Sequence, residues 1–157
     1  MLPGAYNNNY QIVQAPGYVA ILVEMIHDIR IIPTDGRPHV PAGIRQWMGD
    51  SRGHWEGNTL VVETSNLTDK TADVGAGMRR STFRGTDHNL HLIERFTRTD
   101  ADTLMYEFTV DDPTAFSRPW TAQVPMSRSE GPLFEYACHE GNYAMTGVLA
   151  GARAGTK

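Results

Sequence analysis

Residues 47–64 read WMGDSRGHWEGNTLVVET, and this stretch decides the fold class. Two short runs, RGHWE and TLVVE, flank Gly57 and Asn58. A two-residue turn of this kind joins antiparallel strands, because glycine and asparagine accept a positive φ at low cost. The stretch therefore predicts a β-hairpin with strands over 52–56 and 59–65. A second hairpin is predicted by the runs 90–98 and 103–110, which flank a polar turn over 99–102.

The rest of the chain is interrupted by fifteen glycines and nine prolines, with runs rich in β-branched and aromatic residues between them. This pattern is typical of an antiparallel all-β domain. Further strands are predicted over 10–14, 18–32 (with a break near 24–28), 120–127 and 133–138, a long loop over 66–89, and a short helix near 143–153. Consecutive hairpins favour one domain, residues 1–157, folded as an antiparallel meander β-barrel of the lipocalin type or a strongly curled sheet. A two-sheet sandwich is the alternative.

Composition narrows the classes of partner. The chain has 157 residues and a formal net charge of −4, with no cluster of lysine and arginine, so a nucleic-acid partner is not expected. No apolar run reaches the length of a membrane-spanning helix, so membrane insertion is not expected. The single cysteine, Cys138, excludes a disulfide within the chain.

The segment from Gly49 to Gly53 matches the pattern G-x-S-x-G, which can mark the nucleophile Ser51 of a hydrolase. In that fold the serine lies between a strand and a helix, whereas a hairpin follows here, so we interpret both glycines as turn residues. No phosphate-binding loop, H-E-x-x-H or C-x-x-C motif occurs, and no cofactor is predicted. Among six histidines, His88 and His91 lie three apart. The histidines form no tight cluster in the sequence, so no metal site is assigned, although one could assemble in space.

Two polar residues break otherwise apolar strand faces. Side chains alternate faces along a strand. The odd positions from Val19 to Ile31 are apolar except His27, and the even positions from Leu90 to Phe96 are apolar except Glu94. Both side chains are therefore predicted to point into the interior, where a charge without a partner costs several kcal/mol.

An inward histidine and glutamate can act as an acid/base couple in a cofactor-free lyase, isomerase or hydratase. In that hypothesis His27 is the base, Glu94 its partner, and Arg30 or Arg95 anchors an anionic group. Three alternatives stay open. A bulge near Ile26 would turn His27 outward, an inward His27 would be only a hydrogen-bonded core residue, or Arg95 or Arg98 would simply neutralise Glu94.

The function that the sequence favours is binding of a small apolar or aromatic molecule in the barrel interior. The strands 103–110 and 120–127 present clean apolar faces to such a cavity. The candidate walls are aromatic residues and one methionine: Met25, Tyr106, Phe108, Trp120 and Tyr136. The acid/base enzyme and a structural module that pairs sheet edges into a homodimer are the alternatives.

Several long phrases resemble a family of exported, functionally uncharacterised β-rich proteins of soil bacteria, among them acidobacteria and proteobacteria. These phrases are YQIVQAPGYVAILVEMIHDIRIIPTDGRPH (10–39), WMGDSRGHWEGNTLVVET, LHLIERFTRTDADTLMYEFTVDDPTAFSRPWTA (90–122) and EYACHEGN (135–142). The resemblance implies that this chain is the C-terminal β domain of a periplasmic or secreted protein, although the chain itself shows no signal peptide. It assigns no catalytic residue.

Overall fold

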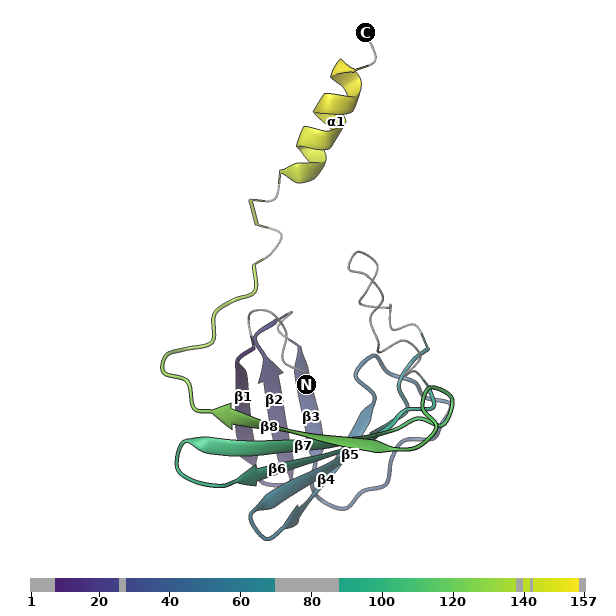
Figure 1. Ribbon diagram of the computed structural model, residues 1–157, viewed down its shortest axis with the longest axis vertical. Coiled ribbons are helices and arrows are strands. Elements are labelled where there is room, and N and C mark those ends of the chain that lie inside the picture. The colour runs from purple at the N-terminus through teal and green to yellow at the C-terminus, as the bar shows by residue number, and fades with distance from the viewer. Residues whose placement is uncertain (1–7, 26–27, 70–87, 138–139, 142, 156–157) are drawn as a thin grey trace.

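The structure is a computed structural model, and it describes residues 8–25, 28–69, 88–137, 140–141 and 143–155. In these residues eight strands are followed by one helix near the C-terminus (Figure 1). The elements are β1 (Tyr10–Ala15), β2 (Tyr18–Val23), β3 (Ile29–Pro33), β4 (Asp50–Glu56), β5 (Thr59–Ser65), β6 (His91–Arg98), β7 (Thr103–Asp111), β8 (Trp120–Ser127) and α1 (Ala144–Ala154).

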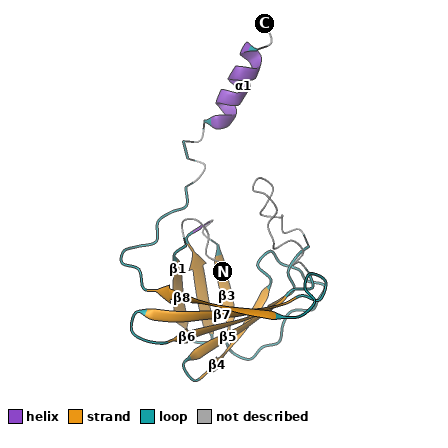
Figure 2. Cartoon of the chain, in the orientation of Figure 1, coloured by secondary structure: helices purple, strands orange, loops and turns teal. Residues whose placement is uncertain are grey.

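The strands form two antiparallel sheets, one with the order β1-β2-β3 and one with the order β4-β5-β6-β7-β8. Figure 2 shows how strands dominate the body and how the strands of the small sheet run across those of the large one. Among the described residues no strand pairing joins the sheets, so no closed barrel is found. We call the two places where the sheets meet without pairing the β3/β4 seam and the β1/β8 seam.

Apolar side chains from both sheets form one core. The small sheet contributes Val19, Ile21 and Ile32, and the large sheet contributes Leu60, Val62, Phe96, Tyr106, Phe108 and Val110. The Tyr106 ring stacks between its neighbours on the sheet, with ring centroids 5.0 Å from Phe96 and 5.4 Å from Phe108. The inward faces predicted for 90–98 and 103–110 are therefore confirmed.

Both predicted hairpins are confirmed. The strands β4 and β5 pair from Asp50 with Ser65 to Glu56 with Thr59, and Gly57 in the turn has φ 59°. The strands β6 and β7 pair around the polar turn 99–102. The predicted helix also forms, one residue further along the chain than expected.

The predicted strand 18–32 breaks as expected, but the prediction of which side chains point inward was wrong after the break. The Val23 N–H donates to the Asp28 carbonyl at 2.9 Å, and Ile21 lies opposite Arg30. An odd position thus faces an even one, so the inward parity changes between the two strands. Ile29 is 57% exposed and Ile31 is 55% exposed, whereas Arg30 is buried.

The prediction of a strand over 133–138 was wrong for the described residues 133–137, which form no strand. The Phe134 N–H donates to Glu24 Oε1 at 3.1 Å instead of joining a ladder. A carboxylate thus takes the hydrogen bond that a neighbouring strand would have supplied. Cys138 lies outside the described residues.

Candidate functional site

A buried ion pair joins the two sheets. Arg30 extends inward from β3, and Glu94 extends inward from β6 and is 0% exposed. Arg30 Nη1 donates to Glu94 Oε1 at 3.1 Å, and Nη2 donates to Oε2. The Tyr106 hydroxyl donates to Glu94 Oε1 at 2.8 Å. Both carboxylate oxygens are therefore hydrogen-bonded, as a buried charge requires.

These contacts fix the protonation states of the cluster. Burial alone would raise the pKa of Glu94, but the charge of Arg30 and its hydrogen bonds outweigh burial and hold the pKa below its ordinary value. Burial and the neighbouring carboxylate together raise the pKa of Tyr106 above its ordinary value of 10.0. At neutral pH Glu94 is ionised and Tyr106 keeps its proton, which it shares with Glu94.

The other catalytic candidates lie elsewhere. His27 is outside the described residues. Arg95 points away from the core, where its Nη2 lies 2.6 Å from Glu56 Oε2. Arg98 donates to the carbonyl oxygens of two residues of the following turn. The alternative in which Arg95 or Arg98 neutralises Glu94 was therefore wrong, because the partner is Arg30.

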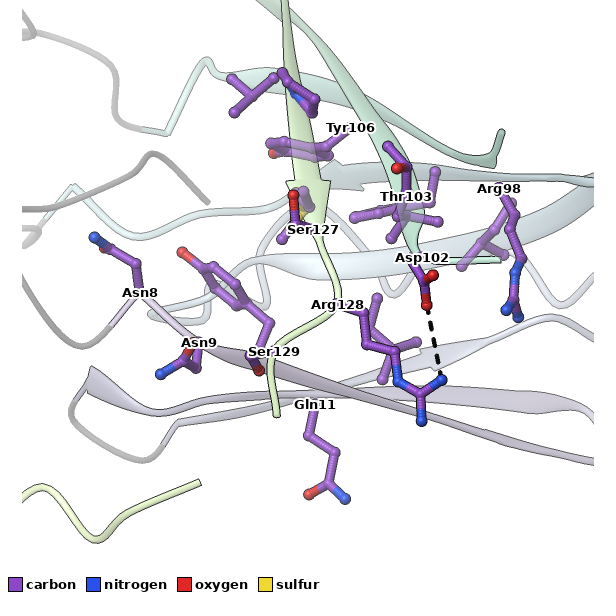
Figure 3. Close-up of a pocket in the computed structure, with 18 of the residues that line it drawn as sticks. Asn8, Asn9, Gln11, Arg98, Asp102, Thr103, Tyr106, Ser127, Arg128 and Ser129 are labelled. Carbon is purple, nitrogen blue, oxygen red and sulfur yellow. Dashed lines mark ion pairs between the residues drawn. The ribbon is translucent and has the colours of Figure 1, made fainter. Parts of the chain in front are cut away.

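A cavity of about 1040 Å³ lies at the β1/β8 seam. Its apolar and aromatic lining, which we call the floor, includes Val19, Leu60, Phe96, Tyr106 and Val124. Its rim is polar, and Figure 3 shows Asn8 and Asn9 on one side and Arg98 on the other. The polar rim residues include Asn8, Asn9, Gln11, Asn58, Arg98, Asp102 and Arg128.

Of the five predicted walls, Tyr106 lines this cavity. Phe108 belongs to the core, and Trp120 packs against it in an edge-on arrangement with ring centroids 5.6 Å apart. Met25 and Tyr136 are half-buried and are not among the lining residues in the described part of the chain. The sequence reasoning missed the rim. The sequence features that could have indicated this rim are the asparagines before the first strand and Arg128 just after the last strand.

Ser51 is not placed as a nucleophile. It lies on β4, it is 4% exposed, and its hydroxyl is 2.8 Å from Thr64 Oγ1. A second serine, Ser65, lies near a histidine and an aspartate. His39 uses one ring nitrogen, Nδ1, for both contacts, with Asp50 Oδ2 at 2.9 Å and Ser65 Oγ at 3.4 Å. A catalytic triad uses the two different ring nitrogens, so this arrangement has the wrong geometry for acyl transfer.

The histidines also bear on metal binding. His91 Nε2 lies 3.7 Å from Glu63 Oε2 on the surface, and the His88 carbonyl accepts a hydrogen bond from Arg45. Within the described ranges, no three histidine, cysteine, aspartate or glutamate side chains gather closely enough to hold a metal ion. In the same ranges, no helix has the length and apolar character needed to cross a membrane.

A second, smaller hollow of about 540 Å³ lies at the β3/β4 seam. Ile29 and Ile31 form one wall, and the exposed side chains of Trp47 and Met48 form the other. The two hollows thus mark the two seams where the sheets separate.

Comparison of the chain with models of protein families, with curated proteins and with solved structures gives no match. The candidate functions therefore depend on the geometry of the two seams and of the buried cluster.

Proposed function

We propose that this domain binds a small molecule with an apolar or aromatic body in the cavity at the β1/β8 seam. The observation that carries the proposal is the cavity itself, with an apolar floor and a rim of converging polar groups, which is the usual composition of a ligand site. In this proposal the two sheets act as a lipocalin-like barrel that is open at both seams, and the β1/β8 seam serves as the mouth. The periplasmic or secreted location expected from the family resemblance stays a prediction.

The buried cluster favours binding over acid/base catalysis. A general acid or base must exchange a proton near neutral pH. Glu94 is held in its ionised form by Arg30, and the Tyr106 hydroxyl already donates its hydrogen bond to Glu94. We infer that this cluster fixes the floor of the cavity and holds the sheets together.

The test uses N-phenyl-1-naphthylamine, a neutral aromatic probe whose fluorescence rises on burial. We expect saturable binding, which Val124→Trp weakens at least about tenfold because the larger ring fills the floor. Gln123→Trp is the matched control, since Gln123 is the neighbouring residue on β8 and points outward. It should leave the affinity unchanged. Equal affinity in both variants, or no saturable binding, would refute the proposal.

A second candidate function is supported by the free edge of β3. Hydrogen-bonded and non-bonded pairs alternate along an antiparallel ladder. The bonds from Val23 to Asp28 and from Thr34 to Gly17 set this alternation for β2 and β3. The backbone groups of Ile29 and Ile31 therefore point away from β2, toward the β3/β4 seam.

The free edges of β8 and β4 carry features that discourage pairing, and the edge of β1 borders the cavity. Pro125 interrupts the donors of β8, and β4 carries the charged side chains of Arg52 and Glu56. The strand β3 instead exposes two isoleucines, while its one charged side chain, Arg30, is turned inward. We propose that β3 pairs with β3 of a second copy of this chain.

Sedimentation velocity over a range of concentrations tests this pairing. Ile31→Pro removes an N–H that points out of the ladder, so the variant should fold normally and stay monomeric where the unmodified chain dimerises. Gln14→Pro makes the same change at the free edge of β1 and should still dimerise. An unmodified chain that is monomeric at every concentration would disprove the pairing.

A further inference from the structure

The mouth of the β1/β8 cavity has a charge opposite to that of the whole chain. Three charged residues line the cavity, Arg98, Asp102 and Arg128, in a chain whose net charge is −4. Figure 3 shows these side chains together at one side of the cavity, with the ion pair between Asp102 and Arg128 drawn. The lining therefore has one positive charge in excess.

The two arginines differ in how their charge is compensated. Arg128 Nη1 lies 3.8 Å from Asp102 Oδ1 in an exposed pair. Arg98 Nε and Nη2 donate to the neutral carbonyl oxygens of Asp100 at 3.1 Å and of Ala101 at 2.7 Å. Among the described residues no carboxylate comes within ion-pair distance of Arg98. The Asp102 backbone N–H and, to a smaller extent, the charge of Arg98 lower the pKa of the neighbouring Asp100 carboxyl, which is not within ion-pair distance of Arg98. The guanidinium of Arg98 is thus positioned by backbone groups and has further N–H donors for a ligand.

The rest of the polar lining is rich in amide side chains, which can donate as well as accept hydrogen bonds. The amide side chains of Asn8, Asn9, Gln11, Gln14 and Asn58 also line the cavity. Each amide carries an NH2 donor group and an acceptor oxygen. Asn9 Nδ2 already donates to Glu24 Oε2 at 2.7 Å, and Asn58 Nδ2 donates to the Arg98 carbonyl oxygen at 3.2 Å. The floor has no comparable donor, because the Tyr106 hydroxyl already donates to Glu94. An anionic group is therefore favoured at the mouth, and an apolar group on the floor.

We propose that the ligand of this cavity is an amphiphilic carboxylate. Its apolar chain or ring packs on the floor between the sheets, and its carboxylate accepts hydrogen bonds from Arg98 and Arg128 at the mouth. This inference rests on the binding function proposed above and adds the chemical class of the ligand.

Displacement of N-phenyl-1-naphthylamine by three ligands of equal chain length tests the class. We expect dodecanoate to displace the probe at a concentration about tenfold lower than dodecanol does, and dodecylammonium to be the weakest. The combined variant Arg98→Gln and Arg128→Gln should remove the advantage of dodecanoate and leave dodecanol unchanged. Arg118→Gln is the control, since Arg118 is exposed and does not line the cavity.

The outcomes separate the two proposals. Equal displacement by all three ligands, or preference for dodecylammonium, would overturn the carboxylate class and leave the binding function standing. A probe that does not bind saturably would overturn the binding function and the ligand class together. Loss of dodecanoate preference in the Arg118→Gln control would show that the effect comes from net charge and would also overturn the assignment to the mouth.

Discussion

At the scale of single residues, the Glu94 carboxylate carries a full charge in the core, and the stability of the folded chain depends on the pairing of this charge with Arg30. We expect Glu94→Gln to lower the free energy of unfolding by about 3–5 kcal/mol, because the Arg30 guanidinium is left buried without its counter-charge. Urea unfolding followed by circular dichroism measures this loss. A change below about 1 kcal/mol would show that water or another group compensates Arg30.

Two further variants distinguish a charge effect from a packing effect. Arg95→Gln breaks the exposed pair with Glu56 and should cost less than about 1 kcal/mol. The paired change of Arg30→Met with Glu94→Met removes both charges at similar volume. It should be more stable than Glu94→Gln alone, since no charge is left buried without a partner.

The same cluster predicts how stability depends on pH. The pKa of Glu94 lies below its ordinary value of 4.5 in the folded chain. A depressed carboxyl pKa contributes stability that is complete above the unfolded pKa and is lost as pH falls through the folded pKa. Each pKa unit of depression corresponds to about 1.4 kcal/mol. Unfolding free energies measured between pH 7 and pH 3 should fall below about pH 4.5, and they should fall less in Glu94→Gln. Equal slopes for the two proteins would contradict this account.

At the scale of elements, Gly53 sets how closely β4 approaches the small sheet. A Cβ at this position would lie 2.9 Å from Ile32 Cγ2 and 3.2 Å from Thr34 Cγ2. We expect Gly53→Ala to destabilise the fold by about 1–3 kcal/mol, because the contact between the sheets must open to accept the methyl group. Gly43→Ala is the control, since nothing lies within 4 Å of its added Cβ. Thermal unfolding of both variants measures the difference, and equal melting temperatures would argue against a close contact at Gly53.

The hairpins could be predicted from the sequence because their determinants are local. Gly57 and Asn58 select a tight turn, and that turn fixes the register from Glu56 to Asp50. The facing of Arg30 could not be predicted in the same way. It depends on the number of residues between β2 and β3, and the apolar run hides where the first strand ends.

The candidate site could be predicted only in part, because only one of its determinants is local. Glu94 was found because it interrupts an apolar face, which is a feature of one strand. Its partner Arg30 lies 64 positions away, and only the packing of the sheets brings the two together. The rim of the cavity likewise combines the ends of β1, β6 and β8, so no single run of residues could indicate it.

At the scale of the whole molecule, the two seams explain where both hollows lie. A closed barrel would pair β3 with β4 and β1 with β8, whereas each of these strands has a single pairing partner in the described structure. Backbone groups left by the open seams are available to a partner strand at β3, and the space between the edges is available to a ligand at β1 and β8. The two open seams thus support one candidate function each.

The helix α1 lies outside this architecture. None of its residues is buried, and Met145 and Val148 are 69% and 66% exposed. A helix of 11 residues with two internal glycines is marginal without a packing partner. We expect removal of residues 144–157 to change the free energy of unfolding by less than about 0.5 kcal/mol and to leave probe binding at the β1/β8 seam intact. Urea unfolding and the fluorescence titration measure both effects against the full chain. A loss above about 2 kcal/mol would mean that the apolar face of α1, which includes Leu149, packs against the sheets in solution.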